Sequence, residues 1–183
     1  LSQIQPHFIY NTLGTIERMC LKDPQKAFDL VRNFSLYLRG NFSELDSVTP
    51  IRFAEELKHV EYYVNIEKVR FPDMSIEYDV EATEFVLPAL SVQPLVENAI
   101  KYNQPGGSVQ ITISRSNGKA ILRVADTGCG IPDEYRTSIF EPFFRVDKSR
   151  SREMGGAGLG LALVREIAAL HGGTVQDEPG EGG

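Results

Sequence analysis

The chain has 183 residues, of which 42% are hydrophobic and 24% are charged, so it can form one large globular domain or two small ones. Its net charge is −6 and it has no basic run, which argues against DNA or RNA as a partner. Its only cysteines, Cys20 and Cys129, are far apart, so neither a disulfide framework nor a zinc-ligand spacing is present. No apolar run approaches the roughly 20 residues of a membrane span, and we expect no membrane contact by this fragment.

The two ends of the chain indicate a piece of a longer protein. The sequence begins without methionine inside a helical pattern, with Leu1, Ile4 and Phe8 at helical spacing. Pro6 is expected to kink this first helix beside His7, because proline removes one backbone donor. The sequence stops within a glycine-rich loop.

Two further helices are expected in the first 70 residues. Asp23 and Pro24 form a typical helix start, with the aspartate as cap and the proline at the first helical position. Gly40 and Asn41 are predicted to end this helix, and a third helix is predicted over residues 52–70. Amphipathic helices this short need a partner surface, so we expect a bundle or a dimer interface. The apolar stripe of the second helix consists of Ala27, Leu30, Val31, Phe34, Tyr37 and Leu38.

After residue 70 the pattern changes to strands and helices. Residues 75–80 alternate as a strand, and helices are expected over residues 90–102 and 159–170. Residues 174–176 are predicted to open one more strand. This half therefore reads as an α/β sandwich, in which helices cover one face of an antiparallel-rich sheet.

A hairpin leads to the first candidate ligand site. Asn117 and Gly118 are typical of a tight turn and should join residues 108–115 to residues 119–126 as antiparallel strands. The second strand is predicted to be buried on both faces, and it ends at Asp126. A carboxylate at a strand end can accept a hydrogen bond from a flat polar edge, and the glycines that follow allow close backbone approach.

Two other stretches carry groups that suit phosphate. Asn98 and Lys101 are three residues apart and so lie near one face of a helix, where they offer an oxygen ligand and a mobile charge. An exposed Glu97–Lys101 pair is the plainer interpretation of that helix. The glycine run at residues 155–160 leads straight into a helix whose first N–H groups could bind phosphate. Arg145 lies upstream, in a polar stretch that could bring positive charge to such a phosphate.

Together these stretches resemble a known family. They read ENAIKYN at 97–103, DTGCGIP at 126–132, FEPFFR at 140–145 and GGAGLGL at 155–161. In this order and spacing they resemble the catalytic domain of sensor histidine kinases, a Bergerat-type ATP-binding fold shared with DNA gyrase and MutL. Residues 3–13, QIQPHFIYNTL, are similar to the phosphoacceptor box of YesM/LytS-like kinases, and residues 62–71 are similar to their linker helix.

The resemblance implies a role for each matching residue. His7 would accept the γ-phosphoryl group of ATP. Asn98 would bind Mg²⁺, and Lys101 and Tyr102 would contact the phosphates and the nearby ribose. Asp126 would accept a hydrogen bond from the adenine amino group. The other ATP-binding residues implied are Gly128, Gly130, Ile131, Arg145, Gly156, Gly158, Leu159, Gly160 and Leu161, and Phe140, Phe143 and Phe144 would support the lid.

The sequence also departs from the larger kinase group. In many histidine kinases an acid follows the phosphoacceptor and can act as base, but Phe8 follows His7 here. The general base therefore stays open, with Glu97 as one candidate. Pro94 stands where the larger group often has asparagine, as suits the YesM/LytS-like branch.

We therefore expect an α+β protein. A helical dimerisation and phosphotransfer segment would span residues 1–70, and an ATP-binding sandwich with a mixed sheet and helices on one face would span 71–183, without its final strand. The expected function is the cytoplasmic kinase core of a bacterial membrane-anchored sensor. It would be homodimeric in the full-length protein, phosphorylate itself from Mg-ATP and pass the group to a response regulator. The alternatives are an ATP-binding scaffold or an ATPase of the same fold without histidine kinase activity.

Overall fold

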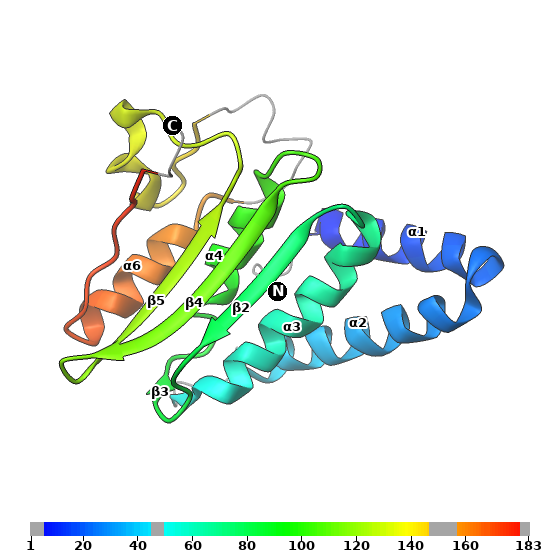
Figure 1. Cartoon of the computed structure of the whole chain (residues 1–183), viewed down its shortest axis with the longest axis horizontal. Helices are drawn as coiled ribbons and strands as arrows, with labels where there is room; N and C mark the ends of the chain where they lie inside the picture. The colour runs from blue at the N-terminus through cyan, green and yellow to red at the C-terminus, as the bar shows by residue number, and fades with distance from the viewer. Residues whose placement is uncertain (1–5, 45–49, 147–156, 180–183) are drawn as a thin grey trace.

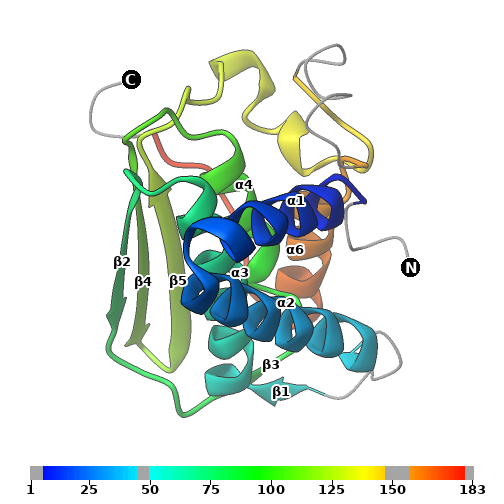
Figure 2. The same ribbon diagram turned by 90° about the vertical axis from the view of Figure 1, so that its right-hand side faces the viewer.

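The structure is a computed structural model that describes residues 6–44, 50–146 and 157–179. The described residues include five α-helices and a three-stranded sheet (Figure 1), and Figure 2 shows that the helices lie on one side of this sheet. The expected α+β class with a mixed sheet is confirmed. The main elements are α1 (Pro6–Lys22), α2 (Pro24–Glu44), α3 (Phe53–Arg70), β2 (Ser75–Val80), α4 (Gln93–Lys101), β4 (Ser108–Ser116), β5 (Lys119–Asp126) and α6 (Gly160–Leu170).

The helical portion largely follows the sequence pattern. Asp23 separates α1 from α2, and its Oδ1 accepts the Lys26 backbone N–H at 3.1 Å, as a helix cap does. The described part of α1 begins at Pro6, so the kink predicted beside His7 stays a prediction. In α2 the predicted stripe is buried except for Val31, which is 50% exposed, and Leu38, which is partly buried.

The predicted end of the second helix is wrong, because α2 continues through Gly40 and Asn41 to Glu44. Gly40 instead allows the close approach of α3: a Cβ there would lie 2.6 Å from Cε1 of His59. Asn41 is buried, and its Oδ1 accepts Nε2 of Gln93 on α4 at 3.4 Å. Both residues thus serve helix packing, which overrides their local tendency to end a helix.

The sheet has the order β2-β4-β5, with β2 parallel to β4 and β4 antiparallel to β5. The predicted hairpin is confirmed, with positive φ angles of 51° at Asn117 and 76° at Gly118. The prediction that β5 is buried on both faces is wrong. It forms an edge of the described sheet, and only Leu122 and Val124 pack against the core.

Helix α4 begins at Gln93, later than the predicted start at Leu90, because Leu90 has a left-handed φ of 60°. The buried carboxylate of Glu56 on α3 receives the backbone N–H groups before α4. It accepts from Leu90 at 2.9 Å, from Val92 at 2.8 Å and from Gln93 at 3.3 Å. A side chain more than thirty residues upstream therefore caps this helix.

Two other details differ from the predictions. β1 (Ile51–Arg52) pairs antiparallel with β3 (Val86–Leu87), and strands of two residues have no alternation that a sequence could reveal. The strand predicted over Thr174–Gln176 is wrong, because that segment pairs with none of the described strands. Helix α6 ends, as predicted, before His171 and the glycines that follow it.

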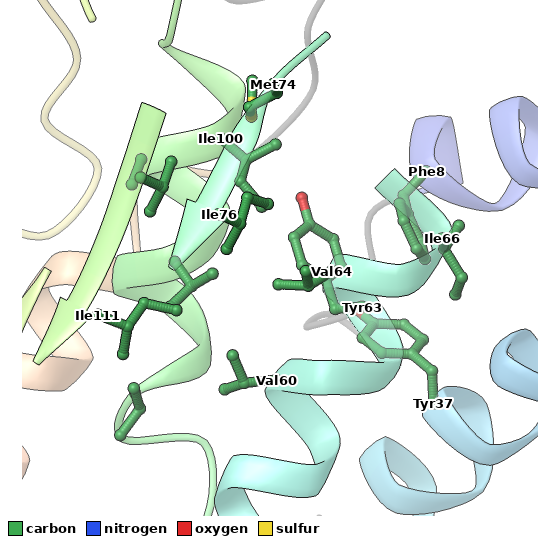
Figure 3. Packing of buried hydrophobic residues seen from close by; sticks show 14 of the residues in the cluster. Phe8, Tyr37, Val60, Tyr63, Val64, Ile66, Met74, Ile76, Ile100 and Ile111 are labelled. Atoms are coloured by element: carbon green, nitrogen blue, oxygen red, sulfur yellow. The ribbon is translucent and has the colours of Figure 1, made fainter. Parts of the chain in front are cut away.

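One cluster of buried hydrophobic residues connects the helices to the sheet. On one side of α3, Tyr63 packs against Phe8 with ring centroids 5.2 Å apart. On the other side, Val60 and Val64 turn toward β2 and β4, where Ile76 and Ile111 lie (Figure 3). The core is thus continuous across residue 70, and the division into two segments there stays a prediction. Among the described helices, none combines the length and the apolar character that a membrane crossing requires.

Candidate functional site

Helix α4 connects two of the sequence motifs, the loop that follows Asp126 and the glycine run that leads into α6. Near its start, a Cβ at Gly160 would lie 3.2 Å from the Cβ of Pro94. Just beyond its end, the backbone oxygen of Tyr102 accepts the N–H of Cys129 at 3.3 Å. Asn98, which is half-buried, lies between these two contacts. The glycine segment and the loop after Asp126 are therefore held at opposite ends of one helix.

The loop after β5 presents one carboxylate and a bare backbone. Asp126 is exposed, and its Oδ1 accepts the N–H of Gly128 at 2.8 Å. A Cβ on Gly128 would lie 2.5 Å from the backbone oxygen of Tyr102, so no larger residue fits without a shift. Gly130 has a φ of 68°, and Ile131 after it is half-buried. This arrangement can accept a hydrogen bond from the polar edge of a flat ligand.

Positive charge gathers at the C-terminal end of α4. Burial lowers the pKa of Lys101, and the charge of Arg145 lowers it further. The Lys101 Nζ lies 5.2 Å from the ring centroid of Tyr102, and burial raises the pKa of that tyrosine. Two cations close enough to affect each other are stabilised when an anion comes between them. The three residues together therefore suit a polyanionic ligand.

The described part of the glycine run, residues 157–160, lies close to the phenylalanine-rich segment at residues 140–145. The backbone oxygen of Gly158 accepts the N–H of Phe143 at 2.9 Å, and a Cβ on Gly158 would lie 2.8 Å from the backbone oxygen of Phe144. Phe140 is buried, whereas Phe143 is 70% exposed. Gly156 lies outside the described residues. Leu159, which is exposed, and Leu161, which is half-buried, flank the start of α6.

His7 lies on the exposed side of α1, next to a small cavity. Nδ2 of Asn11, one turn further along, lies 3.1 Å from both ring nitrogens of His7. Phe8 points the other way into the core, where it packs on Tyr37 with ring centroids 5.0 Å apart. Phe8 therefore has a packing role at the position where many histidine kinases carry an acid. The cavity, of about 90 Å³, is lined by His7, Phe8, Tyr37, Tyr63, Glu67, Arg70, Phe71, Glu97 and Lys101.

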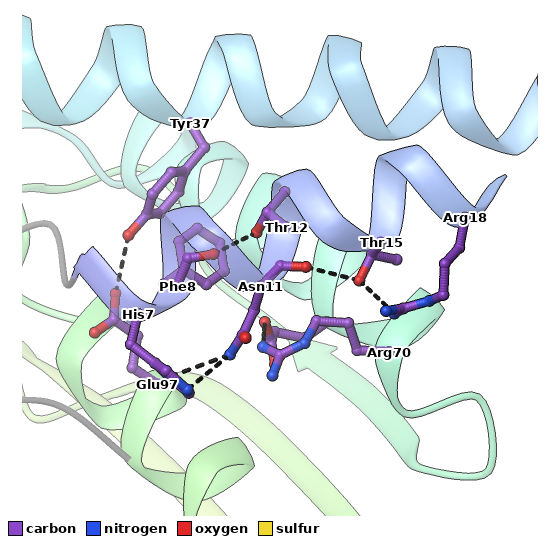
Figure 4. Close-up of polar contacts among 10 residues, drawn as sticks. His7, Phe8, Asn11, Thr12, Thr15, Arg18, Tyr37, Arg70 and Glu97 are labelled. Atoms are coloured by element: carbon purple, nitrogen blue, oxygen red, sulfur yellow. Dashed lines mark hydrogen bonds and ion pairs between the residues drawn. The ribbon is translucent and has the colours of Figure 1, made fainter. Parts of the chain in front are cut away.

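Glu97 is the acid of α4 that reaches this cavity. Its Oε1 accepts the Tyr37 hydroxyl at 3.3 Å (Figure 4). The same oxygen accepts Nε2 of Gln93 at 2.7 Å. Burial raises the pKa of Glu97, and the two hydrogen bonds partly offset that effect. A carboxylate with a raised pKa near a histidine can take up a proton at a pH closer to neutrality. The plainer interpretation, an exposed Glu97–Lys101 pair, does not describe this environment, because both side chains are half-buried.

Two charged residues of this cavity, Glu67 and Arg70, are not among the site residues that the sequence motifs indicate. Glu67 is buried near the end of α3 and bonds Nη1 of Arg70 at 2.6 Å. Both belong to residues 62–71, the stretch that resembles the linker helix, and the resemblance implies no chemical role for them. A signal was present in the sequence, because Glu67 continues the helix face of Val60 and Val64, and an acid on a buried face is rare unless it is paired.

A magnesium ion would depend mostly on the ligand at this site. The described residues contain no group of three or more histidine, cysteine or acidic side chains that could hold a metal. Mg²⁺ is commonly bound through one or two protein oxygens together with phosphate oxygens and water. The amide oxygen of Asn98, a half-buried residue of α4, could serve in that mode.

Comparisons with known proteins agree with this geometry. Residues 88–183, just over half of the chain, match the model of the histidine kinase-, DNA gyrase B- and HSP90-like ATPase family, and residues 1–75 match the histidine kinase model. The sensor protein LytS of Enterococcus faecalis is 33% identical over 93% of this chain and 29% of its own length. The sensor histidine kinase YpdA of Escherichia coli is 34% identical over 92% of this chain and 29% of its own.

A solved structure agrees as well. The mycobacterial sensor histidine kinase MprB is 28% identical with a TM-score of 0.58, over 74% of this chain and 88% of that chain. The present chain spans less than a third of the length of the two curated relatives. It belongs to the histidine kinase-, DNA gyrase B- and HSP90-like ATPase family, and within that family to the sensor histidine kinases.

Proposed function

We propose that this chain binds Mg-ATP and transfers the γ-phosphoryl group to His7, from which it passes to an aspartate of a response regulator. The observation that carries this proposal is the cavity shared by His7 of α1 with Glu97 and Lys101 of α4. Residues 90 positions apart in the sequence meet there, one from the phosphoacceptor box and two from the ATP-binding motif. A scaffold that only bound ATP would not need this juxtaposition.

The residues divide the work of such a reaction. Asp126 would bind the adenine edge, and the glycines after it would let the base lie against the backbone. Lys101, Tyr102 and Arg145 would bind the phosphates, and Asn98 would hold Mg²⁺. The ion would neutralise charge on the phosphates when bound. Phosphoryl transfer is mostly a matter of positioning and charge neutralisation, and these groups supply both.

Glu97 is the base that we propose for His7. A neutral imidazole attacks with the lone pair of one ring nitrogen, while the other nitrogen carries a proton that must leave. The cavity puts Glu97 within the same small volume as His7, held by Tyr37 and Gln93. Phe8, the neighbour of His7, has no group that could accept the proton.

The test is incubation of the wild type and His7→Gln with γ-labelled ATP and Mg²⁺. We expect acid-labile, alkali-stable label on the wild type and none on the variant, with equal ATP affinity for both. Label that persists in His7→Gln would move the acceptor to another residue. ATP binding without any label would favour a scaffold, and steady phosphate release that Glu97→Ala abolishes would favour an ATPase.

The remaining parts of the proposal concern the whole protein. We infer a homodimer, because short amphipathic helices such as α1 and α2 commonly complete a bundle with a second copy. Its relatives are sensor proteins, so the kinase would work on the cytoplasmic side of a membrane-anchored receptor. Sedimentation of the full-length protein and its fractionation with membranes test these two points.

A further inference from the structure

The end of α3 presents an arginine to the cavity beside His7. Arg70 and Glu67 line that cavity together with Glu97 and Lys101 (Figure 4 shows His7, Glu97 and Arg70). The stretch that contains them resembles a linker helix, for which the proposed function has no chemical use. A cation at the last residue of a helix has a simpler explanation, because it complements the helix dipole. Its contacts, however, are more specific than that explanation requires.

Arg70 is held from two sides. Nη1 bonds Oε1 of Glu67 at 2.6 Å, and the guanidinium carbon lies 5.1 Å from the ring centroid of Phe71. The side chain of Glu67 is only 4% exposed, whereas that of Arg70 is 21% exposed. Burial raises the pKa of Glu67, and the charge of Arg70 opposes this. Burying an acid is unfavourable without such a partner, so the pair is more than an exposed ion pair.

The guanidinium retains donors for a ligand. It carries five N–H donors in a planar fork, more than one carboxylate can accept, and the fork matches the oxygens of a phosphoryl group. With the acids ionised, the four charged side chains of the cavity balance each other: Glu67 and Glu97 against Arg70 and Lys101. A phosphoryl group brought to His7 adds negative charge to this small volume. That charge is best met by the cations that already face it.

We propose that Arg70 is a catalytic residue of autophosphorylation, whose guanidinium binds the phosphoryl group as it reaches His7, and that Glu67 positions it. This inference rests on the proposed transfer to His7. In that step the bond between the γ-phosphorus and the bridging oxygen breaks, and its electron pair leaves with ADP. The ring nitrogen of His7 forms the new bond to phosphorus with its lone pair. The proton on the other ring nitrogen goes to Glu97.

The experiment compares the initial rate of His7 labelling and the ATP dissociation constant for Arg70→Ala and wild type. We expect the rate to fall about 100-fold, as when a charge-stabilising donor is removed, and ATP affinity to change less than about twofold. Arg70→Lys should restore only part of the rate, because an ammonium is a point charge without the planar fork. If Arg70→Ala is poorly folded, Arg70→Gln keeps most of the side-chain volume and should show the same loss.

Two further variants separate positioning from folding. Glu67→Gln should lower kcat while KM for ATP stays unchanged, and combining it with Arg70→Ala should cause no further loss, because both act through one guanidinium. Arg18→Ala is the matched control. Its Nη2 bonds Oγ1 of Thr15 at 3.0 Å, also three residues earlier on a helix, and it does not line the cavity (Figure 4). Its labelling rate should stay within about twofold of wild type.

The outcomes distinguish the two levels of the proposal. Wild type that carries no label on His7 overturns the proposed function and this inference with it. A labelled wild type with an equally active Arg70→Ala overturns only the role of Arg70. Loss of ATP binding in parallel with labelling would likewise assign Arg70 to the nucleotide site or to folding, and so contradict the inference.

Discussion

The two sides of α4 are built by different means. On the nucleotide side, Asp126 is exposed and the neighbouring surface is backbone, kept bare by Gly128 and Gly130. On the acceptor side, the cavity beside His7 is walled by side chains from α1, α2, α3 and α4, several of them buried. The turn after Asp126 is therefore local in sequence, whereas the acceptor side exists only when four helices pack together. A change in helix packing would then affect the acceptor side first, while nucleotide binding could persist.

The largest effect is expected from the contact that fixes α4 for both sides. Glu56→Ala removes the acceptor of three backbone N–H groups at the start of α4. Buried donors without acceptors destabilise by about 1–3 kcal/mol each, so we expect the free energy of unfolding to fall by about 3 kcal/mol or more. Chemical denaturation measures this. Glu55→Ala, at the exposed neighbouring position, is the control and should stay within about 0.5 kcal/mol. Equal effects of the two substitutions would contradict the capping role.

Asp126→Asn should affect the nucleotide side alone. The substitution removes a charged hydrogen-bond acceptor worth about 1.5–3 kcal/mol, so ATP affinity should fall about 10- to 100-fold. The melting temperature should stay close to that of wild type, because Asp126 is exposed. Calorimetric titration with ATP measures the affinity. Unchanged binding would remove Asp126 from the nucleotide site.

Tyr37→Phe should affect the acceptor side alone. It removes the hydroxyl that donates to Glu97 at 3.3 Å and leaves the ring packed on Phe8. We expect a loss of about 0.5–1.5 kcal/mol in stability and a slower labelling of His7, with ATP affinity unchanged. The control is Phe34→Leu. Phe34 is buried on the same helix and has no hydroxyl, so this substitution tests whether a change in core packing alone slows the labelling of His7. If it slows labelling as much as Tyr37→Phe does, Tyr37 has no special role.

The smallest effect concerns pH. Burial raises the pKa of Glu97 above its ordinary value of about 4.5, so the folded state binds its proton more tightly than the unfolded state does. The wild type should therefore lose stability as the pH rises from about 4.5 through this raised pKa. The Glu97→Gln side chain does not titrate. The melting temperature of this variant, relative to that of wild type, should therefore rise as the pH increases across this window. A constant difference between the two proteins would argue that Glu97 titrates normally.

Sequence alone determined the features whose cause is local. Asp23 caps α2, and Asn117 and Gly118 form the hairpin, because each is decided within a few residues. Tertiary structure decided the rest. Gly40 continues a helix because α3 packs on it, and Glu56 caps a helix far along the chain. Arg70 and Glu67 join His7 only because α1, α3 and α4 converge, and no local pattern encodes such a meeting.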